Sequence, residues 1–165
     1  MYHYRFTSSW KMETPRAKLW ELVDHFEDID FWQGVTFAKV KQTDDAQGIG
    51  DEYECTFRTK MLFKLKIFLK VVDKSKPNAF KLRVEGPLAG EGTCYLEELD
   101  DGRATLIRCI WEVRLDHSML RVTNPVMRPV YVWSHNKVMD EGVAGVGRHL
   151  QAHVSEASHT TKIYR

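Results

Sequence analysis

The stretch NPVMRPVYVWSHNKVMDEGVAGVGRHL, residues 124 to 150, decides the fold of this chain. Its apolar and small residues return every three or four positions, which predicts one long helix that begins near Asn124. Pro129 lies early in this run, so a kink or a later start near residue 129 is expected. One stripe of the helix should face the rest of the protein, and it comprises His135, Met139, Gly142, Val146 and Leu150.

Working back from this helix, nearly everything between residues 35 and 115 alternates between apolar and polar side chains. The alternation is typical of antiparallel strands with one covered face. A further strand is expected from Tyr2 to Met12. Thr14-Pro15 would start a first helix, with Thr14 as its N-cap, and residues 28 to 32 would form a second, short helix. Residues 154 to 165 are expected to form a frayed polar tail.

A train of antiparallel strands closed by one long helix must bury that helix against the concave face of the sheet. Such an arrangement tends to leave a cavity between helix and sheet, which indicates a small-molecule ligand. We therefore look for function in a pocket, since no Ser-His-Asp set, phosphate loop or nucleophile elbow is recognisable in the sequence.

Composition narrows the class of protein. The 165 residues are 43% hydrophobic and 28% charged, as in an ordinary globular domain. A net charge of +1 gives no reason to expect a nucleic-acid partner. No apolar run is long enough for an integral membrane segment, and the N-terminus lacks the apolar core of a secretory signal.

Three cysteines, Cys55, Cys94 and Cys109, are odd in number and form no CxxC pair. Free thiols in a reducing cytosol fit best, which predicts a cytoplasmic protein. His149 and His153 have the helical spacing seen in zinc sites but lack the glutamate of the usual motif. We predict no metal and no cofactor.

The order of strand, two helices, six strands and long helix resembles the START-like (SRPBCC) superfamily, in its polyketide cyclase/dehydrase-like branch. Trp10-Lys11-Met12 before Thr14-Pro15 is similar to the opening strand and helix of that family. Residues 29 to 35 resemble its tryptophan-rich second helix, and Arg128-Pro129-Val130 with Trp133 resembles the closing helix of bacterial members. The resemblance covers about residues 2 to 151.

This resemblance implies an α+β helix-grip fold: a curved antiparallel sheet of about seven strands round a long C-terminal helix, with two short helices after the first strand. Residues 1–153 would form a single ligand-binding domain, followed by the tail of residues 154–165. The superfamily hosts binding proteins, cyclases and co-chaperones on one scaffold, so the fold alone does not fix the function.

His135 is the candidate catalytic or ligand-orienting residue, since an imidazole on the covered stripe could act as a general acid/base. A buried structural histidine is the alternative. The predicted ligand-binding residues are apolar, aromatic or sulfur-containing, and the same side chains could equally fill a core: Trp32, Tyr53, Phe57, Met61, Leu82, Trp111, Met127, Tyr131, His135 and Met139.

Three functions follow from this. The first is binding of a small hydrophobic molecule such as a lipid, polyketide or aromatic metabolite. The second is a cyclase/aromatase or dehydrase that uses His135. The third is an interaction module, such as a co-chaperone or quinone-delivery protein, that works through its surface. Monomer and homodimer are both compatible with the sequence.

Overall fold

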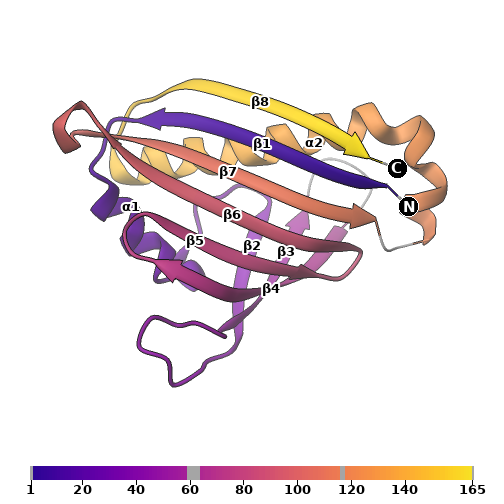
Figure 1. The fold of residues 1–165 in the computed structure, drawn as a ribbon, viewed down its shortest axis with the longest axis horizontal. Helices are drawn as coiled ribbons and strands as arrows, with labels where there is room; N and C mark the ends of the chain where they lie inside the picture. Colours follow the sequence, from indigo (N-terminus) through magenta and orange to yellow (C-terminus); the bar gives the residue numbers. More distant parts are fainter. Residues whose placement is uncertain (1, 59–63, 116–117, 165) are drawn as a thin grey trace.

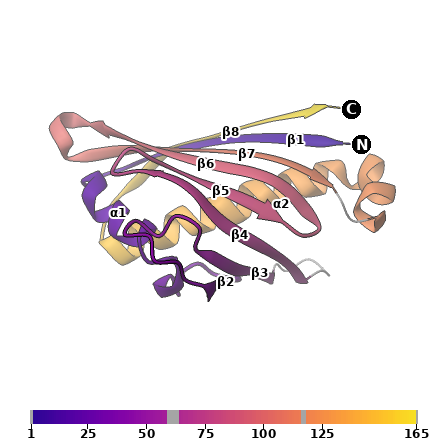
Figure 2. The same ribbon diagram turned by 60° about the horizontal axis from the view of Figure 1, so that its bottom comes forward.

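The computed structural model describes residues 2–58, 64–115 and 118–164. A single sheet of eight strands, in the order β2-β3-β4-β5-β6-β7-β1-β8, curves over the long helix α2 (Figures 1 and 2). The elements are β1 (His3–Met12), α1 (Arg16–Val23), the 3-10 turn η1 (Phe26–Asp28), β2 (Val35–Lys41), β3 (Glu52–Arg58), β4 (Lys64–Ser75), β5 (Ala79–Glu85), β6 (Leu88–Leu99), η2 (Asp100–Gly102), β7 (Ala104–Leu115), α2 (Ser118–Leu150) and β8 (Val154–Tyr164).

Alternating burial along the strands sets which face of the sheet meets α2. In β1 every second residue is buried, and the intervening side chains are exposed or half-buried. All neighbouring strands pair in antiparallel fashion. The predicted α+β architecture, a curved antiparallel sheet round a long C-terminal helix, is therefore confirmed.

The segment after α1 differs from the prediction. Only η1, three residues long, is helical there, so the prediction of a second short helix over residues 28 to 32 is wrong. Phe31 and Trp32 instead lie in an irregular loop that packs on α2, where the Trp32 indole Nε1 donates a hydrogen bond to the Val138 carbonyl oxygen at 2.9 Å. Helix α1 also begins one residue later than expected, with Pro15 rather than Thr14 at the N-cap.

The predicted frayed tail is also wrong, because residues 154 to 164 form the strand β8. It pairs with β1 from Met12↔Val154 to His3↔Tyr164, which brings the sheet to eight strands instead of about seven. The strand is polar because it lies at the edge of the sheet, where natural proteins favour polar side chains. β8 therefore covers a strand edge that β1 would otherwise leave open.

The long helix begins at Ser118, six residues before the predicted start, and both Pro125 and Pro129 lie inside it. Its first turns lie at an angle to the rest of the helix, beyond the ends of β1 and β7 (Figures 1 and 2). Proline removes a backbone donor and crowds the preceding turn, which accounts for a bend here. Within the described residues, no helix is long and apolar enough to cross a membrane.

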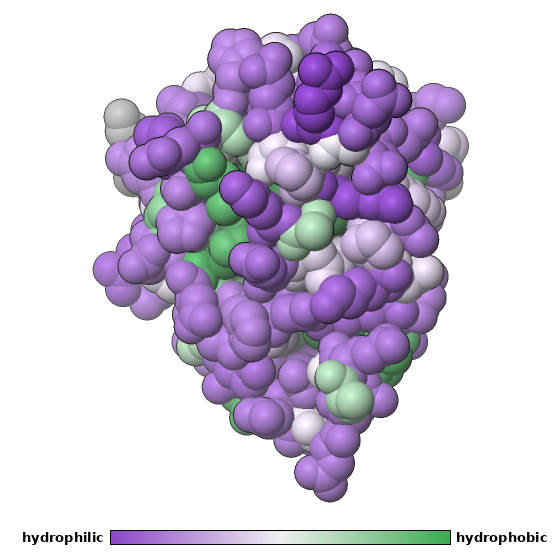
Figure 3. Space-filling model, turned by 90° about the vertical axis from the view of Figure 1, so that its left-hand side faces the viewer, coloured by the Kyte–Doolittle hydropathy of each residue, from purple (hydrophilic) through white to green (hydrophobic). Residues whose placement is uncertain are grey.

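The buried side chains form three clusters between sheet and helix. The first joins α1 to β1, β6 and β7, the second spans β2 to β5, and the third comprises Tyr4, Phe6, Val113 and Leu115 near the start of α2. Figure 3 shows the end of the molecule that carries α1, where a few hydrophobic side chains are recessed in a mostly hydrophilic surface. Trp111 packs against all three clusters, so it lies where they meet.

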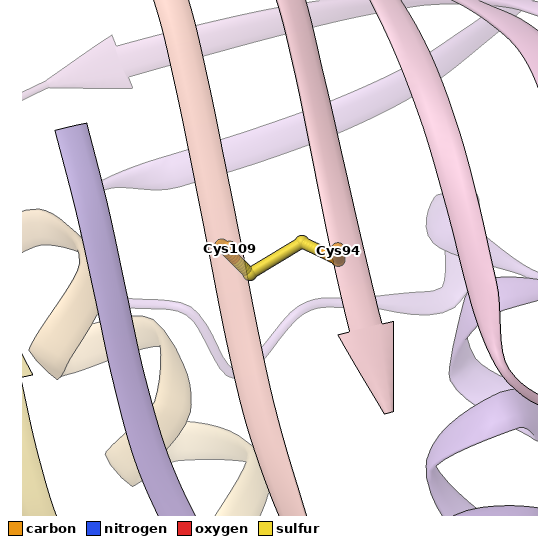
Figure 4. The surroundings of a disulfide bond; sticks show 2 residues. All are labelled: Cys94 and Cys109. Atoms are coloured by element: carbon orange, nitrogen blue, oxygen red, sulfur yellow. A yellow bond between two sulfur atoms is a disulfide. The ribbon is translucent and has the colours of Figure 1, made fainter. Parts of the chain in front are cut away.

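Two of the three cysteines are paired. Cys94 on β6 and Cys109 on β7 are directly opposite in the ladder and form a disulfide (Figure 4). Cys55 is a free, buried thiol, and burial raises its pKa to about 12. The prediction of three free thiols is therefore wrong for Cys94 and Cys109, and the argument for a reducing cytosol loses its support.

Candidate functional site

The candidate site lies between the sheet and the N-terminal half of α2, around Phe6. The His135 ring stacks on the Phe6 ring, with 3.9 Å between the ring centroids and 16° between the planes. Phe6 and Trp111 are directly opposite each other on β1 and β7. Tyr131 packs against the same cluster, four residues before His135 on the helix. The structure thus brings Trp111, Tyr131 and His135 together, as one part of the predicted set.

Trp111 combines a large apolar ring with a polar atom that lacks a partner. A Cβ on Gly92 would overlap the Trp111 ring, so the absence of a side chain there lets the indole lie flat on β6. Its Nε1 is buried and has no hydrogen-bond partner among the described residues. A buried donor without an acceptor costs on the order of 1–3 kcal/mol. An acceptor at this position would therefore bind favourably.

A second group of donors, which the sequence did not indicate, lies beside this one. Tyr4 stacks on Phe6 with 5.5 Å between the ring centroids. Its hydroxyl donates to Asn124 Oδ1 and is hydrogen-bonded by Arg128, while burial raises the Tyr4 pKa. Asn124 is fully buried, and Asn124 Nδ2 and Arg128 Nε have no hydrogen-bond partner within the described ranges. This part of the site therefore holds unpaired donors as well.

The other predicted ligand-binding residues are spread across the core. Tyr53 and Leu82 are buried in the second cluster, where Phe57 packs against them, and the Tyr53 hydroxyl donates to Glu27 Oε2 at 3.2 Å. Met139 is buried in the first cluster. Trp32 lies over Gly142 and packs against the first and second clusters. Met127 is half-buried on α2, and Met61 lies outside the described residues.

Burial sets the protonation of His135. It lowers the His135 pKa from 6.5 to about 4, while the weak contact with Asn136 Oδ1, at 3.4 Å from Nδ1, acts in the opposite direction. The imidazole is therefore neutral at pH 7. A neutral imidazole offers one donor and one acceptor, whereas a general acid would have to carry a second proton.

This lowered pKa predicts a loss of stability in mild acid. Between pH 6.5 and about 4 the unfolded chain protonates His135 and the folded chain does not, so the free energy of unfolding falls as the pH falls. Between pH 7 and pH 4 the free energy of unfolding of His135→Gln should therefore decrease by less than that of the wild type, and the difference should be on the order of 3 kcal/mol. Urea denaturation at pH 7, 5.5 and 4 measures it. The control is His153→Gln, at an exposed histidine, which should show the same change of the free energy of unfolding with pH as the wild type. The same pH dependence in all three proteins would contradict the lowered His135 pKa.

A hydrogen-bonded chain of Ser8, His159 and Asp140 is also present, although no such set was recognisable in the sequence. Ser8 Oγ lies 2.7 Å from His159 Nδ1, and His159 Nε2 lies 2.8 Å from Asp140 Oδ1. The same carboxylate oxygen accepts a hydrogen bond from the Trp10 indole Nε1 at 2.7 Å. The chain joins β1, β8 and α2.

This chain of groups is structural and not a hydrolytic triad. Ser8 is only 1% exposed between the buried Phe6 and Trp10, so a carbonyl carbon has no path to its hydroxyl. The Trp10 bond fixes the carboxylate against the sheet. We therefore call Ser8, Trp10, Asp140 and His159 the β8 latch, because they hold the added strand and the helix on β1.

A separate depression of about 380 Å³ lies where β1, β6 and β7 meet. Its polar and charged lining residues, His3, Arg5, Glu91, Glu112 and Arg114, are on the strand positions that alternate with the buried ones. The Arg5–Glu112 ion pair, 2.9 Å from Nη1 to Oε1, spans part of it. It is therefore distinct from the predicted cavity between sheet and helix.

No family model and no curated protein matches the chain. Solved structures do match. A conserved protein from Geobacillus kaustophilus is 13% identical with a TM-score of 0.70, over 92% of this chain and 99% of that one. A START superfamily protein from Mycobacterium smegmatis is 10% identical with a TM-score of 0.70, over 89% and 99%. Norcoclaurine synthase from Thalictrum is 13% identical with a TM-score of 0.55, over 89% and 95%. The fold of this chain is the START-like helix-grip fold.

Proposed function

We propose that this protein binds a hydrophobic ligand that carries a hydrogen-bond acceptor, such as a carboxylate or a ketone, between the sheet and the N-terminal half of α2. We call the third cluster, with Tyr4, Phe6, Val113 and Leu115, the Phe6 cluster. The observation that carries the proposal is the set of unpaired donors around it. Trp111 Nε1, Asn124 Nδ2 and Arg128 Nε are all buried donors without an acceptor in the described part of the chain. Folded proteins rarely leave such groups unpaired.

The apolar side chains around these donors support the same proposal. Inward-facing Phe57, Phe80, Trp111 and Tyr131 keep some exposure, although each packs against a buried cluster. Burying a ligand on such side chains would supply roughly 25 cal/mol per Å², less the cost of association. The apolar lining would then provide affinity, and the donors would set the orientation of the ligand.

Entry of the ligand requires a movement, because the three donor atoms are shielded from water. Pro125 and Pro129 lie between Asn124 and Tyr131, and each interrupts the hydrogen bonding of the helix backbone. The first turns of α2, which already bend past the sheet (Figure 1), are the part that would open.

The arrangement does not favour the cyclase or dehydrase alternative. His135 is neutral at pH 7 because its pKa is lowered to about 4, and its ring lies face to face on Phe6. The placement in the polyketide cyclase/dehydrase-like branch and the lack of a cofactor stay part of this proposal, as does a monomer or homodimer.

A matched pair of ligands tests the donors directly. Dodecanoate and dodecylammonium share one alkyl chain, but only the first has an acceptor head group. Isothermal titration calorimetry should give one dodecanoate per chain, with an affinity at least about tenfold higher than that of dodecylammonium. Trp111→Phe, which keeps a ring and removes the donor, should weaken dodecanoate about tenfold.

Trp133→Phe is the control, since Trp133 is 55% exposed on the outer side of α2. It should leave the dodecanoate affinity unchanged. Equal affinities for the two ligands, or tighter binding of dodecylammonium, would contradict a pocket that offers donors.

A further inference from the structure

The outer side of α2 carries an exposed apolar stripe in its N-terminal half. Val122, Val126 and Trp133 are 79%, 81% and 55% exposed. Their spacings of four and seven residues put them on one side of a helix with 3.6 residues per turn. Tyr131 and His135 fall on the opposite side by the same count, which agrees with their contacts to the Phe6 cluster. This helix is thus apolar on both sides.

The charged residues within this half of α2 are all of one sign. No aspartate or glutamate occurs from residue 118 to residue 139, whereas Arg121, Arg128 and Lys137 lie in the same span. Arg121 and Lys137 are exposed. The Lys137 ammonium lies 4.9 Å from the centroid of the Trp133 ring, so a cation and an aromatic ring are held together at the surface.

The position of the stripe leaves it open to an extended partner. The first turns of α2 project beyond the ends of β1 and β7 (Figures 1 and 2). The stripe lies on a convex helix surface, and it covers about 17 Å from Val122 to Trp133 at the usual rise of an α-helix. A flat, deformable partner fits this shape better than a protein with a matching groove.

We propose that the N-terminal half of α2 docks on an anionic lipid surface. Tryptophan prefers the boundary between head groups and acyl chains, and exposed valines can enter that boundary beside it. Arg121 and Lys137 would then face lipid phosphates or carboxylates, which attract basic side chains next to a membrane surface. This proposal does not rest on the ligand-binding function, because Val122, Val126 and Trp133 lie on the other side of the helix from Tyr131 and His135.

Sedimentation with vesicles tests the docking. The full-length protein is mixed with vesicles of phosphatidylcholine that contain about 30% phosphatidylglycerol, and with vesicles of phosphatidylcholine alone. We expect at least about tenfold tighter partition onto the anionic vesicles, and weakening as salt is raised. The Trp133 fluorescence should shift to shorter wavelength on binding, and the shift should be missing in Trp133→Phe.

Two variants locate the surface. Val122→Asp with Val126→Asp adds charge to exposed positions, so the fold should persist while the bound fraction falls at least about tenfold. Phe68→Asp with Val40→Asp, at two other exposed hydrophobic residues on β4 and β2, adds the same two charges; it is the matched control and should bind like the wild type.

Three outcomes would overturn the proposal. One is the absence of binding to anionic vesicles. Another is equal binding by the double variant and the control. The last is binding of another partner while vesicles are not bound: either a dimer of the wild type that the double variant abolishes, which would assign the stripe to a second copy of the chain, or capture by an acidic protein.

Discussion

Replacing Asp140 with alanine is expected to lower the free energy of unfolding by about 3 kcal/mol. One carboxylate oxygen of Asp140 accepts from Trp10 Nε1 at 2.7 Å and contacts His159 Nε2 at 2.8 Å. Trp10 is only 1% exposed, so its indole N–H would be left buried without an acceptor. The β8 latch would also lose its link to α2. Urea denaturation at pH 7 measures the change.

Asp140→Asn separates the loss of the acceptor from the loss of charge. The asparagine Oδ1 can still accept from Trp10, so this variant should cost less than about 1 kcal/mol. Glu141→Ala, at the next position of the helix, should also stay within about 1 kcal/mol. If Asp140→Asn is as costly as Asp140→Ala, the latch acts through charge and the hydrogen-bond account is wrong.

Gly142→Ala is expected to destabilise the protein by about 2 kcal/mol, although alanine favours helices over glycine by about 1 kcal/mol. A Cβ on Gly142 would overlap the Trp32 ring, which lies against the helix backbone. The ring cannot move away freely because its Nε1 is bonded to the Val138 carbonyl oxygen. Urea denaturation again measures the effect.

The sign of this effect should reverse once the ring is gone. In a Trp32→Ala background the three atoms nearest to the added methyl group, all of the Trp32 ring, are removed, so Gly142→Ala should stabilise the protein by up to about 1 kcal/mol. The double-mutant cycle therefore predicts a coupling of about 3 kcal/mol between the two positions. A coupling near zero would mean that Trp32 does not restrict this glycine.

The strands from β2 to β7 could be predicted because each has one face in the core, and burial on one face imposes a period of two. β8 has only a weak pattern of this kind, with half-buried His159, Thr161 and Ile163 in a polar sequence. An edge strand owes its place to backbone pairing with β1, which side-chain hydropathy does not encode. The sequence predicts a helix for the loop with Phe31 and Trp32 for a related reason, since the Trp32 ring and the Phe31 backbone lie against the distant Gly142 and Gly145.

The disulfide could have been predicted from the sequence. The turn at Asp100-Asp101-Gly102 is recognisable, and it sets a register in which Leu99 faces Ala104. Counting five residues outward along both strands puts Cys94 opposite Cys109. The hydrogen-bonded groups could not have been found in this way. Tyr4 and Asn124 are 120 residues apart, and Ser8 and His159 are 151 apart, so only the folded sheet and helix bring them together.

The helix stripe is predicted correctly, and the structure shows what two of the helix glycines do. Gly142 gives room to the Trp32 ring and Gly145 to the Phe31 backbone, so these glycines accommodate a loop and not a strand of the sheet. His135 does face the core, as its contact with Phe6 shows. That His135, Trp111 and Tyr131 orient a ligand is part of the proposed function.

The indole N–H signals in a ¹H–¹⁵N NMR spectrum test the central claim most directly. The five tryptophans give five such signals, and Trp111→Phe assigns the one that matters. Trp10 and Trp32 are already hydrogen-bonded, and Trp20, which also lacks a partner among the described residues, is buried in the first cluster. Adding dodecanoate should move the Trp111 signal downfield until one equivalent is bound and leave these three unchanged. A Trp111 signal that does not move, or a change confined to exposed Trp133, would contradict a ligand held between the sheet and α2.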